Sequence, residues 1–165
     1  MAEMLAKKTK FKLVKLNALA KKKKLLTSYD KKRRSWIASI AKLKKEVKKL
    51  ERAHGNLVIE SLYAHEFPAG ITIILRCNPK ILASRLGKKY TWPTKITENV
   101  EAEMIGLITQ EAVEYNRTVY EIDTTGKTAA QTANAIMKIL NYERGNHKLS
   151  GTVKKYKVGG INWLE

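Results

Sequence analysis

The stretch ITIILRCNPKILASRLGKKYTWPTKITENVEAEM, residues 71–104, decides the fold class. Its apolar, β-branched start predicts a strand from Ile71 to Leu75 that is buried on both faces of a parallel sheet. Pro79 stands where helices prefer to begin, and the apolar spacing after it predicts a short helix that ends at Gly87. After a linker, a second helix is expected from Thr94, with one apolar stripe that continues to Ile108. Strand, helix, linker and helix indicate an α/β protein.

Several segments of this region are similar to one known family. They are LRCNP at 75–79, the pair Arg85 and Leu86, KITENVEAE at 95–103, YEIDTTG at 120–126 and the ending from Tyr156 to Glu165. The chain resembles the adenylate-kinase-like ribosome-biogenesis family of archaea and eukaryotic nuclei, whose members are small P-loop nucleoside-monophosphate kinases. The resemblance implies an α/β fold with a three-layer parallel sheet of that kinase type.

Length and hydropathy suggest how the chain is organised. Its 165 residues fit one kinase-like α/β domain at residues 1–141, with a basic C-terminal extension at residues 142–165. No apolar run approaches the roughly 20 residues that a membrane-spanning helix needs, and no secretory signal is recognised. The single cysteine, Cys77, fits a reducing compartment. We therefore expect a soluble protein of the cytoplasm, with no membrane partner.

The charge of the chain is large and uneven. Lysine and arginine number 33 against 15 aspartate and glutamate, a net charge of +18. Residues 1–53 alone hold 19 basic and 4 acidic residues. Phosphate groups neutralise such a surface, so the charge predicts nucleic acid as the partner.

A basic face is expected on one long helix from Asp30 to Arg52. Trp36, Ile40, Leu43, Val47 and Leu50 share one face at helical spacing and are predicted to be core. The opposite arc is basic, which favours phosphate contact over a merely solvated face. The full set of predicted RNA-binding residues is Lys21, Lys22, Lys23, Lys24, Lys31, Arg34, Lys42, Lys45, Lys48, Lys49, Arg52, Lys88, Lys89, Lys154, Lys155 and Lys157.

The remaining elements are read from shorter patterns. We expect a helix at Ala2–Lys8, an edge strand at Phe11–Leu16, strands at Asn56–Ile59 and Val119–Asp123, and a helix at Ala129–Leu140. Either Thr125 or Thr128 is expected to cap the last of these helices.

The resemblance also implies positions left over from a nucleotide site. Glu60 occupies the place of a carboxylate that assists the metal, His65 matches a histidine of the family pattern, and Leu62 stands where another histidine is expected. Thr124, Thr125 and Gly126 correspond to a loop that passes the adenine, although a simple strand-to-helix turn is the favoured interpretation. No spacing of the three histidines predicts a metal site.

Phosphoryl transfer in this fold uses the glycine-rich loop G-x-x-x-x-G-K-[ST], and this motif does not occur in the sequence. Residues Ala2–Lys8 resemble the helix that follows the loop, so the first strand and the loop are expected to have been lost together. The sequence therefore predicts a protein that is not an enzyme, has no catalytic residues and needs no cofactor or small-molecule substrate.

The predicted function is a noncatalytic, structural rRNA-binding component of the archaeal small (30S) ribosomal subunit. Ribosomal RNA and neighbouring ribosomal proteins are the expected partners. The alternative is a nucleotide-dependent ribosome-assembly factor, or a nucleoside-monophosphate kinase whose P-loop is missing from this chain.

Overall fold

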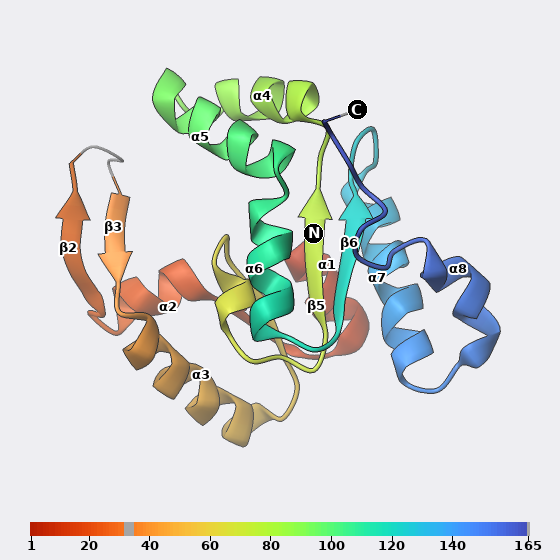
Figure 1. Ribbon diagram of the computed structural model, residues 1–165. Helices are drawn as coiled ribbons and strands as arrows, with labels where there is room; N and C mark the ends of the chain where they lie inside the picture. The colour runs from red at the N-terminus through yellow and green to blue at the C-terminus, as the bar shows by residue number, and fades with distance from the viewer. Residues whose placement is uncertain (32–34, 165) are drawn as a thin grey trace. The chain divides into compact units, whose positions relative to one another are not determined.

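The computed structural model describes residues 1–31 and 35–164. The chain divides into two compact units, Met1–Phe67 and Pro68–Glu165 (Figure 1). Each unit holds its own strand pairs and helices.

Unit 1 combines a parallel strand pair with a separate hairpin. Its elements are α1 (Ala2–Thr9), β1 (Lys12–Lys15), α2 (Leu16–Lys22), β2 (Leu26–Asp30), β3 (Ser35–Ala38), α3 (Ile40–His54), β4 (Leu57–Glu60) and the 3-10 turn η1 (Ala64–Glu66). Strands β1 and β4 run parallel, in register from Lys12 opposite Leu57 to Lys15 opposite Glu60. Leu16, Leu43 and Phe67 are the largest buried side chains of the unit's core.

The prediction of one long helix from Asp30 to Arg52 is wrong for the described residues before Ile40, and residues 32–34 lie outside the described part of the chain. Strands β2 and β3 form an antiparallel hairpin there, and α3 begins only at Ile40. Trp36 lies opposite Tyr29 across the hairpin, with ring centroids 5.3 Å apart, and is 61% exposed rather than core. The cross-strand aromatic pair explains the strand, because aromatic residues favour this arrangement. Leu43 and Val47 are buried, so the rest of the predicted stripe is confirmed.

Unit 2 contains the stretch that decided the fold class. Its elements are β5 (Thr72–Arg76), α4 (Pro79–Gly87), α5 (Pro93–Met104), α6 (Leu107–Tyr115), β6 (Val119–Asp123), α7 (Ala129–Glu143), the 3-10 turn η2 (His147–Leu149) and α8 (Ser150–Lys154). Strands β5 and β6 are parallel, from Thr72 opposite Val119 to Arg76 opposite Asp123. Figure 1 shows α6 on one side of this pair and α7 on the other. The parallel pair brings the carboxyl ends of both strands to one edge.

The order strand, helix, linker and helix is confirmed. Pro79 is in the first turn of α4, where the Asn78 side chain accepts a hydrogen bond from the Lys80 N–H at 3.0 Å. The expected apolar stripe does not continue as one helix, because Gly106, with φ of 66°, separates α5 from α6. Leu75 is 40% exposed, so β5 is not buried on both faces.

The C-terminal segment is not confirmed as an extended tail. Val153 in α8 is 1% exposed, and the Glu121 N–H donates to the Tyr156 carbonyl at 2.8 Å. An antiparallel bridge pairs Lys157 with Tyr120. Residues of this segment therefore pack against unit 2 itself. Among the described residues, no helix is long and apolar enough to cross a membrane.

The architecture is a mixed α/β fold with parallel strands, which is consistent with a P-loop kinase-like protein. The single three-layer sheet and the loss of a first strand, both expected from the sequence, are not confirmed.

Candidate functional site

The turns that follow β5 and β6 are tied together at the carboxyl edge of the strand pair. The Thr124 hydroxyl and its backbone N–H both donate to the Arg76 carbonyl at 2.8 Å. The Thr125 hydroxyl oxygen accepts a hydrogen bond from the Asn78 N–H at 2.8 Å. In open α/β sheets, ligands bind in the crevice outside this edge. These contacts therefore build the place in unit 2 where a ligand is expected.

Charged side chains hold the same loop. Arg85 of α4 donates to the Thr124 carbonyl at 3.2 Å, and the Asp123 carboxylate accepts from the Thr125 N–H at 2.8 Å. The Lys127 ammonium donates to the Asp123 carbonyl. Gly126 lies between them with φ of 65° and open space where a Cβ would point. The loop is thus preorganised while its outer side stays open.

A cavity of about 360 Å³ borders this loop. Its walls come from β6, from the start of the β6–α7 turn and from the C-terminal segment; the lining residues are Glu121, Asp123, Lys127, Lys155, Tyr156, Gly160, Ile161, Asn162 and Trp163. Its volume is within the range of small-molecule sites, which is roughly 300–1,000 Å³. Its charged groups are two ammonium groups, of Lys127 and Lys155, and two carboxylates, of Glu121 and Asp123. Because Arg76 neutralises Glu121, the lysines outweigh Asp123, and with two aromatic rings the cavity suits an anionic ligand that carries a flat ring.

A second hollow, of about 680 Å³, is lined by residues 113–120 and by Lys157 and Val158. It lies at the amino end of β6, away from the turns that follow the strands. There the Tyr120 hydroxyl meets the Glu143 carboxylate. Burial, together with this hydrogen bond and the nearby negative charge, raises the pKa of Tyr120 above its usual value. Position relative to the strands makes the cavity beside Lys127 the better candidate.

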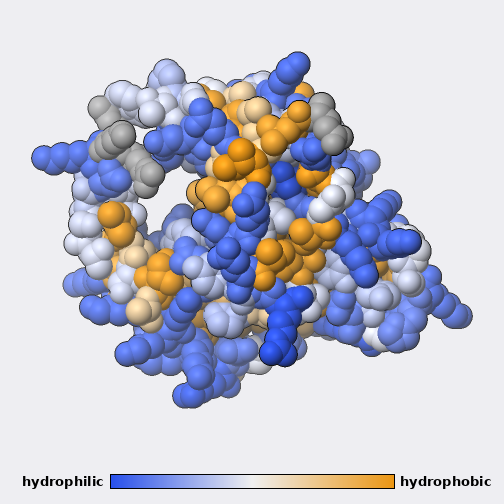
Figure 2. Space-filling model, in the orientation of Figure 1, coloured by the Kyte–Doolittle hydropathy of each residue, from blue (hydrophilic) through white to orange (hydrophobic). Residues whose placement is uncertain are grey.

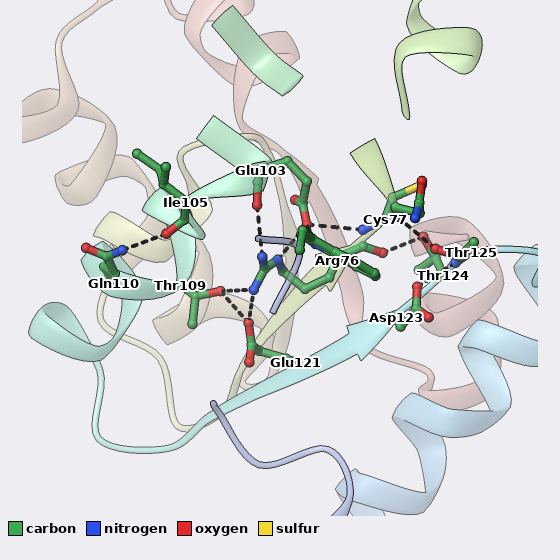
Figure 3. A network of polar contacts seen from close by, with 12 residues as sticks. Arg76, Cys77, Glu103, Ile105, Thr109, Gln110, Glu121, Asp123, Thr124 and Thr125 are labelled. Carbon is green, nitrogen blue, oxygen red and sulfur yellow. Dashed lines mark hydrogen bonds and ion pairs between the residues drawn. The ribbon is translucent and has the colours of Figure 1, made fainter. Parts of the chain in front are cut away.

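Beneath the loop lies a buried ion cluster, drawn in Figure 3. Arg76, the last residue of β5, is 3% exposed and donates from Nε to Glu103 Oε1 at 2.6 Å. Its Nη1 group donates to Glu121 Oε1 of β6 and, at 3.4 Å, to the Thr109 hydroxyl. A buried arginine needs such partners, since an unpaired charge in the interior is costly. The cluster joins β5, β6 and the junction of α5 and α6.

The structure brings three of the implied nucleotide-site positions together. Thr124, Thr125 and Gly126 lie side by side in the β6–α7 turn, whereas the cap of α7 is Thr128, which forms a capping box with Gln131. The prediction of a strand-to-helix turn capped by Thr125 or Thr128 is confirmed for Thr128. Thr124 and Thr125 are used instead to fix the turn to β5.

Glu60 and His65 lie in unit 1, near the end of β4. Glu60 is exposed at the last position of the strand. His65 is 4% exposed in η1, so its imidazole is packed inside the unit. Among the described residues, no group of three or more His, Cys, Asp and Glu side chains could hold a metal ion.

The predicted RNA-binding residues that the structure describes are all exposed. They are Lys21 and Lys22 in α2, Lys23, Lys24 and Lys31 in turns, Lys42, Lys45, Lys48, Lys49 and Arg52 in α3, Lys88 and Lys89 after α4, and Lys154, Lys155 and Lys157 in the C-terminal segment. Arg34 lies outside the described residues. Lys23 and Lys49 both pair with Glu46, at 2.9 and 2.6 Å, so the basic surface is partly neutralised within the chain.

Sequence reasoning missed the residues that build the cavity and its support. Glu103, Glu121, Lys127 and Trp163 were not singled out, and Lys155 was assigned only to RNA. One signal was available: Arg76 directly follows an apolar, β-branched run, and a charged residue at the end of a buried strand calls for a buried partner.

Figure 2 shows hydrophobic side chains exposed over α5 and α6. Met104, Ile105 and Leu107 belong to them, with Ile105 54% exposed. They surround the break at Gly106. Scattered exposed apolar residues are common, and this group does not define a ligand site.

Parallel strand pairs with helix-linked turns beside a cavity are consistent with a P-loop kinase-like α/β protein. Comparison with known proteins supports this class. Residues 1–106 match the AAA domain family, and the chain belongs to it. A protein of Methanosarcina acetivorans named "Putative adenylate kinase" is 35% identical, over 99% of this chain and 90% of its own length.

Other relatives carry the same name. The one from Methanosarcina barkeri is 34% identical with the same coverage. The one from Thermococcus onnurineus is 38% identical, over 67% of this chain and 56% of its own length.

These relatives overturn the main functional prediction. A noncatalytic rRNA-binding component of the small ribosomal subunit is wrong, because near full-length relatives are named for a kinase and no comparison supports a ribosomal protein. The expectations of a nonenzyme, of rRNA and ribosomal proteins as partners, and of no small-molecule substrate are wrong for the same reason. The alternative of a nucleoside-monophosphate kinase is better supported.

Proposed function

We propose that this protein is a nucleotide kinase of the adenylate kinase type, which transfers a phosphoryl group from ATP to AMP and releases two ADP. The observation that carries the proposal is the likeness of nearly the whole chain to relatives with that name. The cavity beside the β6–α7 turn supplies a place for one nucleotide.

The lining of the cavity suits a nucleotide in two ways. The ammonium groups of Lys127 and Lys155 can pair with phosphate oxygens, and Tyr156 and Trp163 offer ring faces for a base. During transfer, an oxygen of the AMP phosphate forms a bond to the γ-phosphorus of ATP, while the bond from that phosphorus to the bridging oxygen breaks. Lysines near the phosphates stabilise the negative charge that shifts between the two nucleotides.

Magnesium accompanies this chemistry. The ion keeps several waters and binds substrate phosphates together with one or two carboxylates, so it does not require a closed cage of protein ligands. A bound ion would neutralise phosphate charge during transfer.

The glycine-rich phosphate loop does not occur among the 165 residues of the sequence. Backbone N–H groups of that loop normally cradle the phosphates.

The test measures ADP formation from ATP and AMP by the purified chain, with ATP binding followed separately by calorimetry. We expect saturable ADP formation that requires both nucleotides. Lys127→Met should reduce kcat by about 10²-fold. Lys138→Met is the matched control, because this exposed lysine lies on the outer face of α7.

Failure to form ADP at concentrations that saturate ATP binding would contradict the proposed transfer. Equal activity in the Lys127→Met and Lys138→Met proteins would contradict the assignment of the site. Contaminating kinase activity is recognised by ADP formation in a mock preparation purified in the same way from cells that lack the chain.

A further inference from the structure

One wall of the cavity is formed by a segment that is distant in the sequence from the other wall. Residues 155–163, here called the C-terminal strap, contribute Lys155, Tyr156, Gly160, Ile161, Asn162 and Trp163 to its lining. The opposite wall is β6 with the turn after it. The shape of the site therefore depends on what holds the strap in place.

Two carboxylates hold the strap. Glu103 Oε1 accepts a hydrogen bond from the Trp163 indole N–H at 2.7 Å. Glu121 Oε2 accepts one from the Gly159 N–H at 3.0 Å. Hydrogen bonds to ionised acceptors are about twice as strong as neutral ones. The strap is thus attached at two points. Trp163 and Glu103 are 60 residues apart in the sequence, and Gly159 and Glu121 are 38 residues apart.

The same carboxylates are the partners of Arg76. Glu103 Oε1 accepts from Arg76 Nε, from the Cys77 N–H at 3.3 Å and from Trp163. Glu121 presents Oε1 to Arg76 and Oε2 to the strap. One buried guanidinium therefore orients both fastening points, because moving it would leave two carboxylates without their cation.

Arg76 also fixes the direction of α5. Its Nη2 group donates to the Glu103 backbone carbonyl, in the last turn of α5, at 2.9 Å. Beside it, a Cβ built on Gly106 would lie 3.5 Å from the guanidinium nitrogens. The break between α5 and α6 is thus packed against the arginine. Helices α4 and α5, here called the helical arm, contact the rest of unit 2 at this point and through the hydrogen bond from Arg85 to the Thr124 carbonyl.

We propose that Arg76, Glu103 and Glu121 are positioning residues that couple the helical arm to the strap and so control the ligand cavity. The inference rests on the proposed nucleotide function for the identity of the ligand. A bound nucleotide presses on the strap, and the strap transmits its position to the end of α5 through Trp163, Glu103 and Arg76. Conversely, loosening Glu103 widens the cavity and weakens nucleotide binding.

The first part of the test needs no nucleotide. In the Trp36→Phe/Trp92→Phe protein, Trp163 is the sole tryptophan and reports on the strap through acrylamide quenching. Glu103→Gln keeps the side-chain shape but removes the charge, and we expect quenching of Trp163 to increase. Glu101→Gln is the matched control, because Glu101 is exposed on the same helix two residues earlier. Unchanged quenching in Glu103→Gln would contradict the attachment of the strap through Glu103.

The second part measures ATP affinity by calorimetry. Glu103→Gln should bind ATP about tenfold more weakly, since the lost interaction involves a charged acceptor. Trp163→Phe keeps a ring and leaves Arg76 paired, so it should fold normally and lose affinity to a similar extent. Lost affinity in both variants, with no loss in Glu101→Gln, supports the coupling.

The outcomes separate this inference from the proposed function. If Glu103→Gln increases quenching but leaves ATP affinity unchanged, the proposal that these residues control the cavity is contradicted, while the proposal of nucleotide binding is not. Absence of ATP binding by the unmodified protein would contradict the proposed function, and with it the nucleotide as the ligand. The quenching result in the free protein would still decide whether the strap is held by Glu103.

Discussion

Arg76 is the residue on which most of unit 2 depends. It is buried at the end of β5 and binds two carboxylates, one hydroxyl and one carbonyl. Buried ion pairs contribute little net stability when compared with apolar packing, but removing one partner is costly. The physical consequence is that the cluster specifies one arrangement of β5, β6 and α5.

Arg76→Met is predicted to destabilise the protein by about 3–5 kcal/mol, because the buried Glu121 and the partly buried Glu103 would both lose their cation. Arg117→Met serves as the control, since Arg117 is exposed and surface substitutions usually change stability by about 0.5 kcal/mol or less. Urea unfolding followed by circular dichroism measures both. A loss below about 1 kcal/mol for Arg76→Met would mean that the cluster is not needed for the fold.

At the scale of elements, α7 is closed at its start by its own capping box, which Thr128 and Gln131 form. At its end, Glu143 accepts a hydrogen bond from the hydroxyl of Tyr120 in β6, which attaches the helix to the strand. Burial and this carboxylate raise the pKa of Tyr120, so the folded protein keeps the hydroxyl protonated at a pH where the unfolded chain has lost the proton. The attachment is therefore sensitive to alkaline pH.

The sign of this effect follows from linkage. Above pH about 10 the unfolded state binds fewer protons at Tyr120 than the folded state, so the free energy of unfolding falls as pH rises, by at most about 1.4 kcal/mol per pH unit. We expect the stability difference between the unmodified protein and Tyr120→Phe to be full near pH 8 and to narrow above pH 10. A difference that stays constant from pH 8 to pH 11 would contradict the raised pKa.

Elements with their own local signals were predictable. Pro79, Gly87 and Pro93 mark the bounds of α4 and the start of α5, and Thr128 was among the predicted caps. The β2–β3 hairpin could not be predicted in this way, because Trp36 falls by chance at helical spacing from Ile40 and Leu43. Short strands and buried helix faces are not distinguished by periodicity alone.

The site was harder to predict than the elements. Thr124 and Thr125 were identified through the resemblance, but the contact of Glu103 with Trp163 joins residues too far apart for any local pattern. The net charge of +18 led to the prediction that nucleic acid is the partner. Net charge indicates which kinds of molecule a protein associates with, but it does not identify the functional site on a fold.

For the whole molecule, we expect the proposed nucleotide site in unit 2. The Methanosarcina relatives cover nearly all of the chain, and the cavity at the carboxyl end of β6 is where a parallel strand pair presents a ligand site. The strap closes that cavity from the other side. Ligand binding should therefore stabilise two segments that are distant in the sequence.

Hydrogen–deuterium exchange with and without ATP tests this placement most directly. We predict that ATP slows amide exchange in residues 121–128 and 155–163 together, because both line the cavity and the strap is fastened to β6. Exchange in residues 133–143 of α7, which contribute nothing to the lining of the cavity, should not change. Protection absent from both predicted segments, or confined to residues 113–119 at the amino end of β6, would contradict the account.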